Sequence, residues 1–352
     1  MNGAQQGCQP FDRLRANGCL CGIFIAKHNY MIPQRILAIL LGAAALSLGL
    51  ALLSGSLPLS PLEVWNALLD RGDDTAAEVI WQLRLPRVLA AFACGGLLAL
   101  SGVLLQALLR NPLADPYILG ISGGAAVGAL AAMLLGARLV VTQLASFGGA
   151  TLAIVAVFGL GFRRGERNIY RLLLTGVVLS AGCGAVVSIL LTLAQGEQVK
   201  GMLFWLMGDL SHPQGLSFAW LVLLVAGAGA TVFSGGLDVL AGGLDKAAAL
   251  GVAVVRWQMM LYFAAAVLTV AALQLGGSIG FVGLMIPHAI RLLGISAHRW
   301  LVPLSMLLGG SFLVLADTLA RTLWSPLQLP VGILTALLGV PVMLWLLASR
   351  RP

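Results

Sequence analysis

Long apolar runs follow one another from about residue 36 to the C-terminus, and they decide what this chain can fold into. Each run is continuous rather than alternating, which is typical of membrane-spanning helices and not of β-barrel strands. Hydrophobic residues make up 59% of the 352 residues and charged residues 10%, whereas a soluble domain carries about 25% charge. The sequence therefore predicts an all-α integral membrane protein.

Ten spanning helices are predicted from the positions of the apolar runs. They form one membrane domain, residues 31–352, and lie at residues 36–56, 86–109, 117–136, 141–162, 171–194, 215–233, 257–275, 280–293, 301–321 and 331–348. Residues 1–30 contain no run long enough to span a membrane. We interpret them as a disordered cytoplasmic tail or, alternatively, as an over-long start with Met31 as the true initiator.

The positive charges are unevenly distributed between the predicted loops. With ten spans, 15 of the 21 Lys and Arg residues fall on the side that holds both chain ends, and 6 fall on the other. Because basic loops stay in the cytoplasm, both termini are predicted to be cytoplasmic. The net charge of +8 therefore reflects topology, since no basic, aromatic-interleaved surface is available to bind nucleic acid.

The shortest polar break, residues 110–128, predicts a tight turn between two helices. Pro112 and Pro116 each remove a backbone donor and push the preceding residue out of helical geometry. The helix that follows carries a face almost without side chains, which lets another helix approach closely in a membrane. That face consists of Gly120, Gly123, Gly124 and Gly128.

Two other classes of membrane protein remain as alternatives. Residues 120–124 match the G-x-S-x-G pattern, so an intramembrane serine protease using Ser122 is one, although small-residue packing is the favoured interpretation. An ion-coupled carrier is the other, and it needs ionisable groups at mid-membrane. The predicted spans hold few such groups. Asp317 and Arg321, spaced i, i+4, are expected to form a local ion pair or a surface contact.

The cytoplasmic loop at about 234–255 is too polar to span and too apolar for a solvated linker. Residues 245–250 can form a short helix that stops at Gly251. A short, partly apolar helix predicts docking to a partner. The chain has no G-x-x-x-x-G-K-[ST] loop, so a separate subunit must hydrolyse any ATP that acts here.

Several stretches resemble the permease subunit of type II ABC importers, the FecCD-type family that takes up iron–siderophores, haem and cobalamin. In family order they are RLPR at 84–87, Ser101, Gly102, Gln106, NPLADP at 111–116, LGIS at 119–122, LGV at 250–252, GFVGLMIPH at 280–288, Arg291, Ala316, Asp317, Arg321 and LPVG at 329–332. The resemblance implies ten spans and a homodimer with the pathway on its two-fold axis. It also implies a periplasmic binding protein and two cytoplasmic ATPase subunits that bind ATP and magnesium.

The resemblance also implies roles for particular residues. The fifth span would line the pathway with Thr175, Gly176, Ser180, Gly184 and Ser188. The cytoplasmic gate would lie at Asn111, Leu113, Ile169 and Tyr170, although some relatives carry small hydroxyl residues at the last two positions. The ATPase would contact Leu240, Leu244, Asp245, Lys246, Leu250 and Gly251.

At the outer mouth, the resemblance implies that arginines face acidic residues of the binding protein. These are Arg84, Arg87 and Arg321, and two-fold symmetry would double them to six. The expected cargo is a metal chelate carried through a bacterial inner membrane. Haem is favoured over siderophore or cobalamin, with weak support from Met202, Met207 and His212 near the mouth. The chain itself is expected to bind lipid but no cofactor or metal, and to catalyse no reaction.

Overall fold

The computed structural model describes residues 33–55, 57, 59–69, 74–161, 169–325 and 327–349, and every regular element in these ranges is a helix. The predicted all-α class is therefore confirmed for these residues. The predicted tail, residues 1–30, lies outside them. A first helix, Pro33–Leu53, opens the described chain. The labelled elements that follow are α2 (Pro61–Leu68), α3 (Asp74–Glu78), the π-helix η1 (Val79–Arg84), α4 (Leu85–Leu109), the 3₁₀ helix η2 (Pro116–Leu119), α5 (Ile121–Leu134), α6 (Leu139–Gly161), α7 (Ile169–Leu193), α8 (Glu197–Met207), α9 (Leu216–Val232), α10 (Ser234–Ala241), α11 (Leu244–Ala249), α12 (Val254–Gly276), α13 (Val282–Leu292), α14 (His298–Thr322) and α15 (Val331–Ser349).

Six helices of the described chain are long and apolar enough to cross a membrane, or seven if α9 and α10, bent by 67°, count as one span. The six are Pro33–Leu53, Thr75–Leu109, Leu139–Gly161, Arg171–Leu193, Val254–Gly276 and His298–Thr322. Three shorter apolar helices are Ile121–Leu134, Val282–Leu292 and Val331–Trp345. Each of the ten predicted spans coincides with one of these helices. The count of ten and the sidedness of the termini stay predictions, because helix length supports only six or seven.

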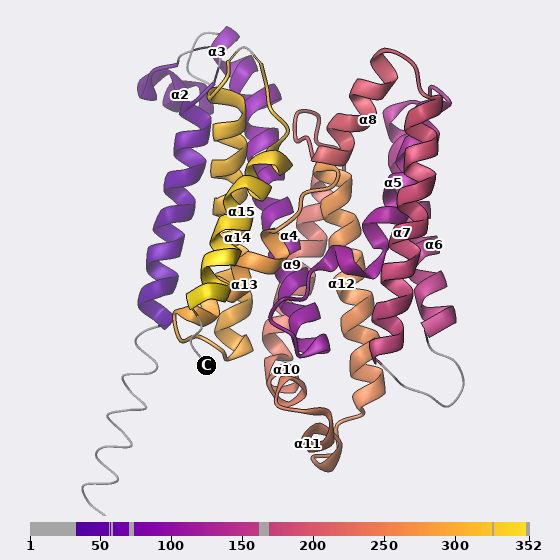
Figure 1. Ribbon diagram of the computed structural model, residues 1–352. Coiled ribbons are helices and arrows are strands. Elements are labelled where there is room, and N and C mark those ends of the chain that lie inside the picture. The colour runs from indigo at the N-terminus through magenta and orange to yellow at the C-terminus, as the bar shows by residue number, and fades with distance from the viewer. Residues whose placement is uncertain are drawn as a thin grey trace, which may run out of the picture.

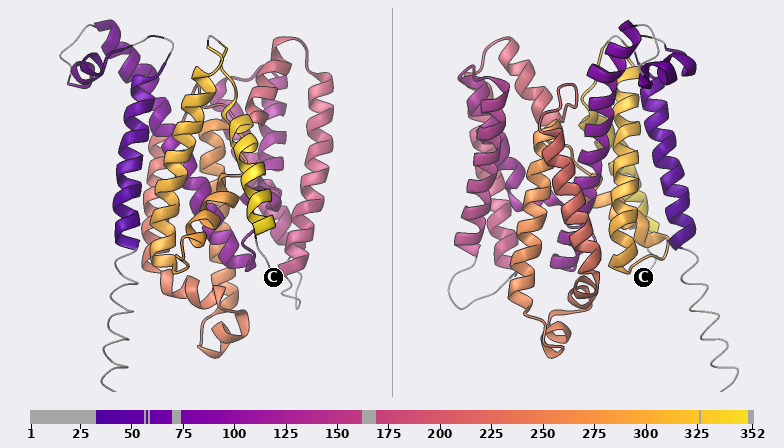
Figure 2. Two further views of the ribbon diagram at one scale, coloured as in Figure 1. Left: turned by 60° about the vertical axis from the view of Figure 1, so that its left-hand side comes forward. Right: turned by 180° about the vertical axis from the view of Figure 1, so that it is seen from behind.

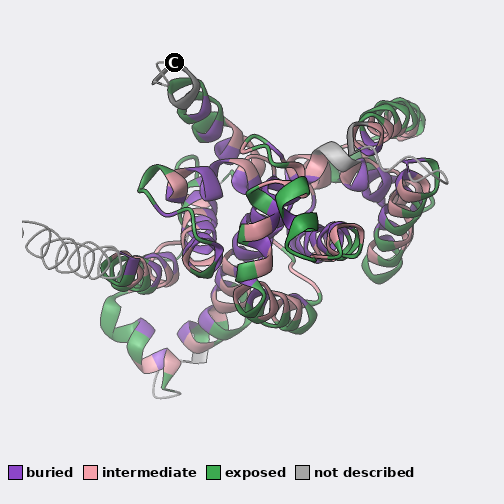
Figure 3. Ribbon diagram, turned by 90° about the horizontal axis from the view of Figure 1, so that it is seen from below, coloured by how far each residue is buried: buried purple, intermediate pink, exposed green. Residues whose placement is uncertain are grey.

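Helix α4 lies at the centre of the bundle and packs against α12, α14, α13 and α9. In the helix Thr75–Leu109, 89% of the apolar stretch is buried, and buried residues gather in the middle of the molecule (Figure 3). Pro86 lies where the continuous helix Thr75–Leu109 changes from the π-helix η1 to α4, and its missing N–H coincides with this change in hydrogen bonding. The helix ends at Arg110, which has a left-handed φ of 49°. This is the turn that the prolines at 112 and 116 predict.

Glycines let α4 touch its neighbours through backbone atoms. A Cβ on Gly95 would lie 2.1 Å from the carbonyl oxygen of Gly309 on α14. A Cβ on Gly102 would lie 1.9 Å from the carbonyl oxygen of Gly283 on α13. Burial of apolar side chains yields little net gain between helices in lipid, so close backbone contact is what holds such helices together. The central helices can pack this closely only with glycine at these positions.

Helices α5, α6 and α7 form a second group beside the core (Figure 1). The glycine face predicted for α5 packs against two neighbouring helices. A Cβ on Gly124 would lie 2.4 Å from the carbonyl oxygen of Gly149 on α6, and a Cβ on Gly123 would lie 2.9 Å from Cβ of Cys183 on α7. Helix α7 is the least buried of the six long apolar helices, with only 11% of its apolar stretch buried.

The two ends of the bundle differ. Helices α2 and α3 lie at one end, and α10 and α11 project beyond the bundle at the other (Figures 1 and 2). We call these the α2 end and the α11 end. Helix α2 begins with a capping box in which the Ser60 backbone N–H donates to the Glu63 carboxylate at 2.6 Å and the Glu63 N–H donates to the Ser60 hydroxyl at 3.3 Å.

We expect Gly149→Ala to destabilise the α5–α6 pair, because its Cβ would lie 2.1 Å from the carbonyl oxygen of Gly124. Overpacking of this kind costs about 1–3 kcal/mol. The matched control is Gly148→Ala on the same helix, where nothing lies within 4 Å of the new Cβ. The control should be neutral or slightly stabilising, since alanine favours helix by up to about 1 kcal/mol. Thermal unfolding in detergent measures both, and equal midpoints would contradict the packing.

Candidate functional site

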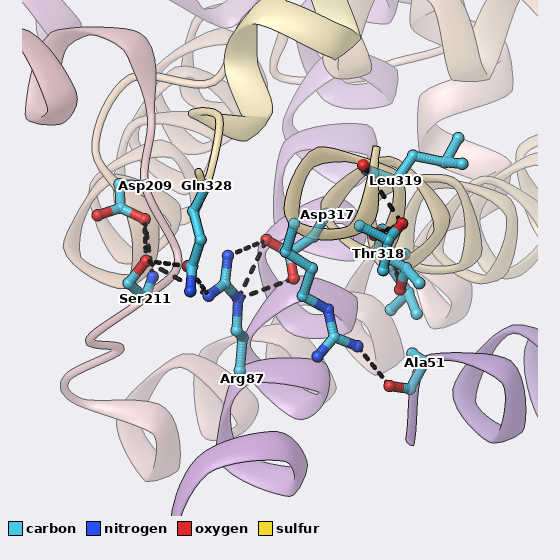
Figure 4. Close-up of polar contacts among 11 residues, drawn as sticks. Ala51, Arg87, Asp209, Ser211, Asp317, Thr318, Leu319 and Gln328 are labelled. Carbon is cyan, nitrogen blue, oxygen red and sulfur yellow. Dashed lines mark hydrogen bonds and ion pairs between the residues drawn. The ribbon is translucent and has the colours of Figure 1, made fainter. Parts of the chain in front are cut away.

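Arg87 is the centre of a polar cluster at the α2 end (Figure 4). Its Nε lies 2.9 Å from Oδ2 of Asp317, and its Nη2 lies 2.9 Å from Oδ1. Its Nη1 donates to Gln328 at 2.9 Å and to Ser211 at 3.4 Å, and the Ser211 hydroxyl donates to Asp209 at 2.6 Å. Arg87 and Asp317 are both buried, and the two-point pair offsets the cost of removing their charges from water. The cluster ties α4 and α14 to the segments that precede α9 and α15.

The expected pairing of Asp317 with Arg321 is wrong, because Asp317 pairs with Arg87 instead. Arg321 donates from Nη2 to the carbonyl oxygen of Ala51. Arg84 donates to the carbonyl oxygens of Leu52 at 2.6 Å, Leu53 at 3.3 Å, and Leu57. The last carbonyls of a helix lack partners within it and attract cations. Two guanidinium groups therefore cap the end of the first helix, a contact that spacing along the chain does not reveal.

A cavity of about 610 Å³ opens beside these arginines, and Arg84, Arg87 and Arg321 all line it. His212 and Gln328 line it as well. The structure thus brings together the three arginines predicted to dock a binding protein. Each of them already has a partner inside the chain. The docking role stays a prediction, and the same side chains also hold the fold.

Helix α7 carries the five residues predicted to line a pathway, on two different sides. Gly184 and Ser188 are exposed, and nothing lies within 4 Å of a Cβ on Gly184. The Ser188 hydroxyl donates to the Gly184 carbonyl at 3.0 Å, which leaves this side only weakly polar. Gly176 is buried and Thr175 half-buried. The Ser180 hydroxyl is buried without a hydrogen-bond partner and lies toward Gly120, the residue before α5.

The predicted gate at Asn111 and Leu113 lies in the turn between α4 and η2. The Asn111 side chain accepts from the Leu113 N–H at 2.9 Å, and the Asp115 carboxylate accepts from the Tyr117 N–H at 2.8 Å. Leu113 is 37% exposed. The other two gate residues, Ile169 and Tyr170, begin α7, and their side chains lie outside the described residues.

The segment predicted to dock an ATPase consists of α10 and α11. Leu240 is only 1% exposed and packs in the core, so it cannot contact a partner, and that part of the prediction needs correction. Leu244 is half-buried, while Asp245 and Lys246 are exposed. Leu250 is 70% exposed, and Gly251 ends the helix with a φ of 79°. The surface available to a partner is therefore α11 and the turn that follows it.

A contact that the sequence analysis missed joins α10 to α14. One oxygen of Asp238 accepts from the backbone N–H of His298 at 3.0 Å and lies 2.6 Å from Nδ1 of the same residue. His298 is the first residue of α14. Sixty positions separate the two residues in the chain, so no local pattern could have paired them.

The G-x-S-x-G match is accounted for by packing, since Gly124 contacts α6 and Gly123 contacts α7. Within the described part of the chain, no group of three or more His, Cys, Asp or Glu could hold a metal ion.

The comparisons with known proteins agree on one family. The FecCD transport family matches residues 37–349. The chain is 41% identical over 303 residues to the cobalamin import system permease protein BtuC of Halobacterium salinarum, across 85% of this chain and 81% of that protein. The chain belongs to the FecCD transport family. It is also 40% identical over 310 residues to the hemin transport system permease protein HmuU of Yersinia pestis, across 84% of this chain and 90% of that protein.

Two solved structures are similar to this FecCD chain. A metal-chelate type ABC transporter in an inward-facing conformation matches with a TM-score of 0.79 and 31% identity, over 90% of this chain and all of that chain. PsaBC from Streptococcus pneumoniae matches with a TM-score of 0.55 and 18% identity, over 77% of this chain and 93% of that chain. The second match shows the fold alone.

In this FecCD chain, two of the motif residues hold the turn at residues 110–116 in place, which we call the gate turn because the gate is predicted there. The Gln106 amide donates to the carbonyl oxygens of Ala114 at 3.4 Å, Gly283 at 3.2 Å and Leu284 at 3.3 Å. Arg291 on α13 donates to the Gln106 carbonyl oxygen. The sequence analysis matched Gln106 and Arg291 to the family without assigning them a role, because Gln106 and Arg291 lie 185 positions apart and the helix that brings them together is not readable from local spacing.

We expect the gate turn to lose stability as pH rises from about 4 to 6. Burial raises the pKa of the Asp115 carboxyl from its ordinary 3.8 to about 6. The unfolded chain therefore loses this proton first as pH rises, and the folded state is penalised by up to about 3 kcal/mol above pH 6. Asp115→Asn keeps an acceptor for the Tyr117 N–H and removes the proton.

The measurement is the thermal unfolding midpoint in detergent from pH 4.5 to 7.5. The advantage of Asp115→Asn over the parent chain should grow through this range and level off above about pH 7. Glu78→Gln, which changes an exposed carboxylate, should follow the parent at every pH. A constant difference between Asp115→Asn and the parent would mean that Asp115 titrates normally.

Proposed function

We propose that this chain is the membrane permease subunit of an ATP-binding-cassette importer that moves a metal chelate into the cytoplasm. The observation that carries the proposal is the FecCD match across residues 37–349. It is supported by two permeases of about 40% identity that are named for cobalamin and hemin import. The match to a metal-chelate type transporter over 90% of the chain adds the architecture.

We infer that two copies of the chain enclose the pathway between them. The support is the contrast between the central and the outer helices. The stretch of Thr75–Leu109 is 89% buried and that of Arg171–Leu193 only 11%. The exposed side of α7 offers Gly184 and Ser188, whose small size and internally bonded hydroxyl suit a smooth wall. A second copy related by two-fold symmetry would supply the opposite wall.

The energy source would be an ATPase subunit that docks at the α11 end. The support is the projecting helix α11 with exposed Asp245, Lys246 and Leu250, together with the absence of a nucleotide-binding loop from the sequence. ATP and magnesium would bind that subunit. The α11 end would then be cytoplasmic, as the Lys and Arg distribution predicts, with ten spans set in the bacterial inner membrane.

The binding protein would dock at the α2 end, around the arginine-lined cavity. Arg84, Arg87 and Arg321 bring three positive charges to that cavity, and Asp317 neutralises one of them. A net positive mouth would steer an acidic partner in a salt-dependent manner. Since these arginines also hold the fold, their removal is a poor test of docking.

The cargo would be a macrocyclic metal chelate, because cobalamin and haem, the cargoes in the names of the two relatives, both are. Haem is our favoured cargo. Met202, one residue noted in support of haem, is fully buried and cannot line a mouth, while His212 is exposed beside the cavity.

The test is reconstitution of the chain in vesicles with the ATPase and binding protein encoded beside it. We expect accumulation of haem, cyanocobalamin or a ferric siderophore that requires ATP, the ATPase and the binding protein together. Comparing the three cargoes decides among them. Uptake driven by a proton or sodium gradient without the ATPase would overturn the proposal in favour of an ion-coupled carrier.

We expect Gly184→Trp to block transport by filling the pathway. Nothing lies within 4 Å of the Gly184 Cβ position, so the new ring can project outward without disturbing its own protomer. The matched control is Gly159→Trp on the exposed side of α6, where the space is equally open. Uptake should fall at least tenfold in the first variant and stay within about twofold of the parent in the control. Equal uptake by both would show that α7 faces lipid.

A further inference from the structure

Helix α14 is anchored at each end by a carboxylate. At the α11 end, Asp238 of α10 holds the first residue, His298, through its backbone N–H and its ring at 3.0 and 2.6 Å. At the α2 end, Asp317 of α14 holds Arg87 of α4 through contacts of 2.9 Å. Asp317 lies nineteen positions after His298 on α14, which is about 29 Å along the axis.

The body of α14 is packed tightly enough to move as one piece. Backbone contact with α4 at Gly309 fixes its middle, where a Cβ would lie 2.6 Å from Cβ of Ala99. Ser305 and Leu313 are fully buried on either side. Pro303 removes one backbone hydrogen bond in the second turn of α14. Leu301, Val302 and Leu304 around it are fully buried, so close packing passes an axial displacement across this turn.

Helix α10 is equally well held at the other side of the Asp238 contact. Leu237 and Leu240 on it are buried, and the ring of Trp257 lies directly on Gly236, 2.2 Å from where a Cβ would be. Only two residues, Gly242 and Gly243, separate α10 from α11. A displacement of α11 therefore reaches Asp238 across a link of only two residues.

The Asp238 contact has the chemistry of a firm anchor. A carboxylate at the start of a helix accepts an otherwise unpaired backbone N–H and is stabilised by the helix dipole. With Nδ1 donating to Asp238, the buried Nε2 of His298 is left as a bare acceptor, without a hydrogen-bond partner. The hydrogen bond from the His298 ring to Asp238 therefore joins α14 to α10.

We propose that Asp238 and His298 are positioning residues that couple movement of the docking helix α11 to α14, and through Asp317 and Arg87 to the mouth at the α2 end. The inference rests on the proposed function, since it assigns a task to the segment between the two partners. Helix α14 would then transmit to the ATPase whether a binding protein is docked at the mouth.

The test measures ATP hydrolysis by the reconstituted complex with and without the binding protein. Asp238→Ala and His298→Ala should each lower the stimulation by the binding protein about tenfold. Asp238→Asn keeps an oxygen that can accept both hydrogen bonds, and it should restore stimulation to within about twofold of the parent. Glu78→Gln, an exposed carboxylate on α3, should match the parent.

Two further measurements separate coupling from simple loss of structure. The amount of ATPase subunit that co-purifies with Asp238→Ala should equal that of the parent, whereas a merely structural role would reduce it. Combining Asp238→Ala with Asp317→Asn should lower stimulation no further than the stronger single change, because both cut the same connection. Additive losses would show two independent contacts and overturn the proposal.

The parent complex tests the proposed function, and the variants test the coupling role. If the parent shows no ATP-dependent uptake, the importer assignment itself fails. If the parent transports and the Asp238 and His298 variants are stimulated normally, only the coupling role of α14 is wrong.

Discussion

The fold depends on backbone contact between helices, because apolar side chains gain little by packing together in a solvent that is itself apolar. At Gly95 and Gly309, and again at Gly102 and Gly283, a single added carbon would collide with a carbonyl group. These contacts hold α4 in the middle of the bundle. The same device at Gly124 and Gly149 joins α5 to α6, so one physical constraint organises both helix groups.

Charged side chains, unlike the glycines, join elements at the two ends of the bundle. At the α2 end, Arg84 and Arg321 cap the carbonyl end of the first helix, and Arg87 pairs with Asp317. At the α11 end, Asp238 caps the start of α14. Each contact satisfies a polar group that would be costly to leave unpaired in a low-dielectric setting. Each also joins two elements far apart in the chain, which suits a protein whose ends are proposed to meet different partners.

The least buried helix is as informative as the most buried one. Helix α7 leaves Gly184 and Ser188 exposed, and no other described residue of the chain covers them. The pathway that the FecCD resemblance implies for the fifth span stays a prediction on this exposed side. Ser180 was predicted for the same wall, yet its hydroxyl is buried and lies toward Gly120. The row 176, 180, 184, 188 turns by about 40° around the helix axis at each step, so it passes from the buried side at Gly176 to the exposed side at Ser188.

The sequence by itself determined the helical class, the positions of the apolar helices, the turn at Arg110 and the family. These follow from local composition, from proline and glycine chemistry, and from short motifs, which all depend on residues close together in the sequence. Only the tertiary structure decided that Asp317 pairs with Arg87 and not Arg321, that Leu240 is buried, and that Asp238 holds His298. Those outcomes depend on which helices lie side by side, and in a bundle of similar apolar helices that choice is made by backbone fit across long separations.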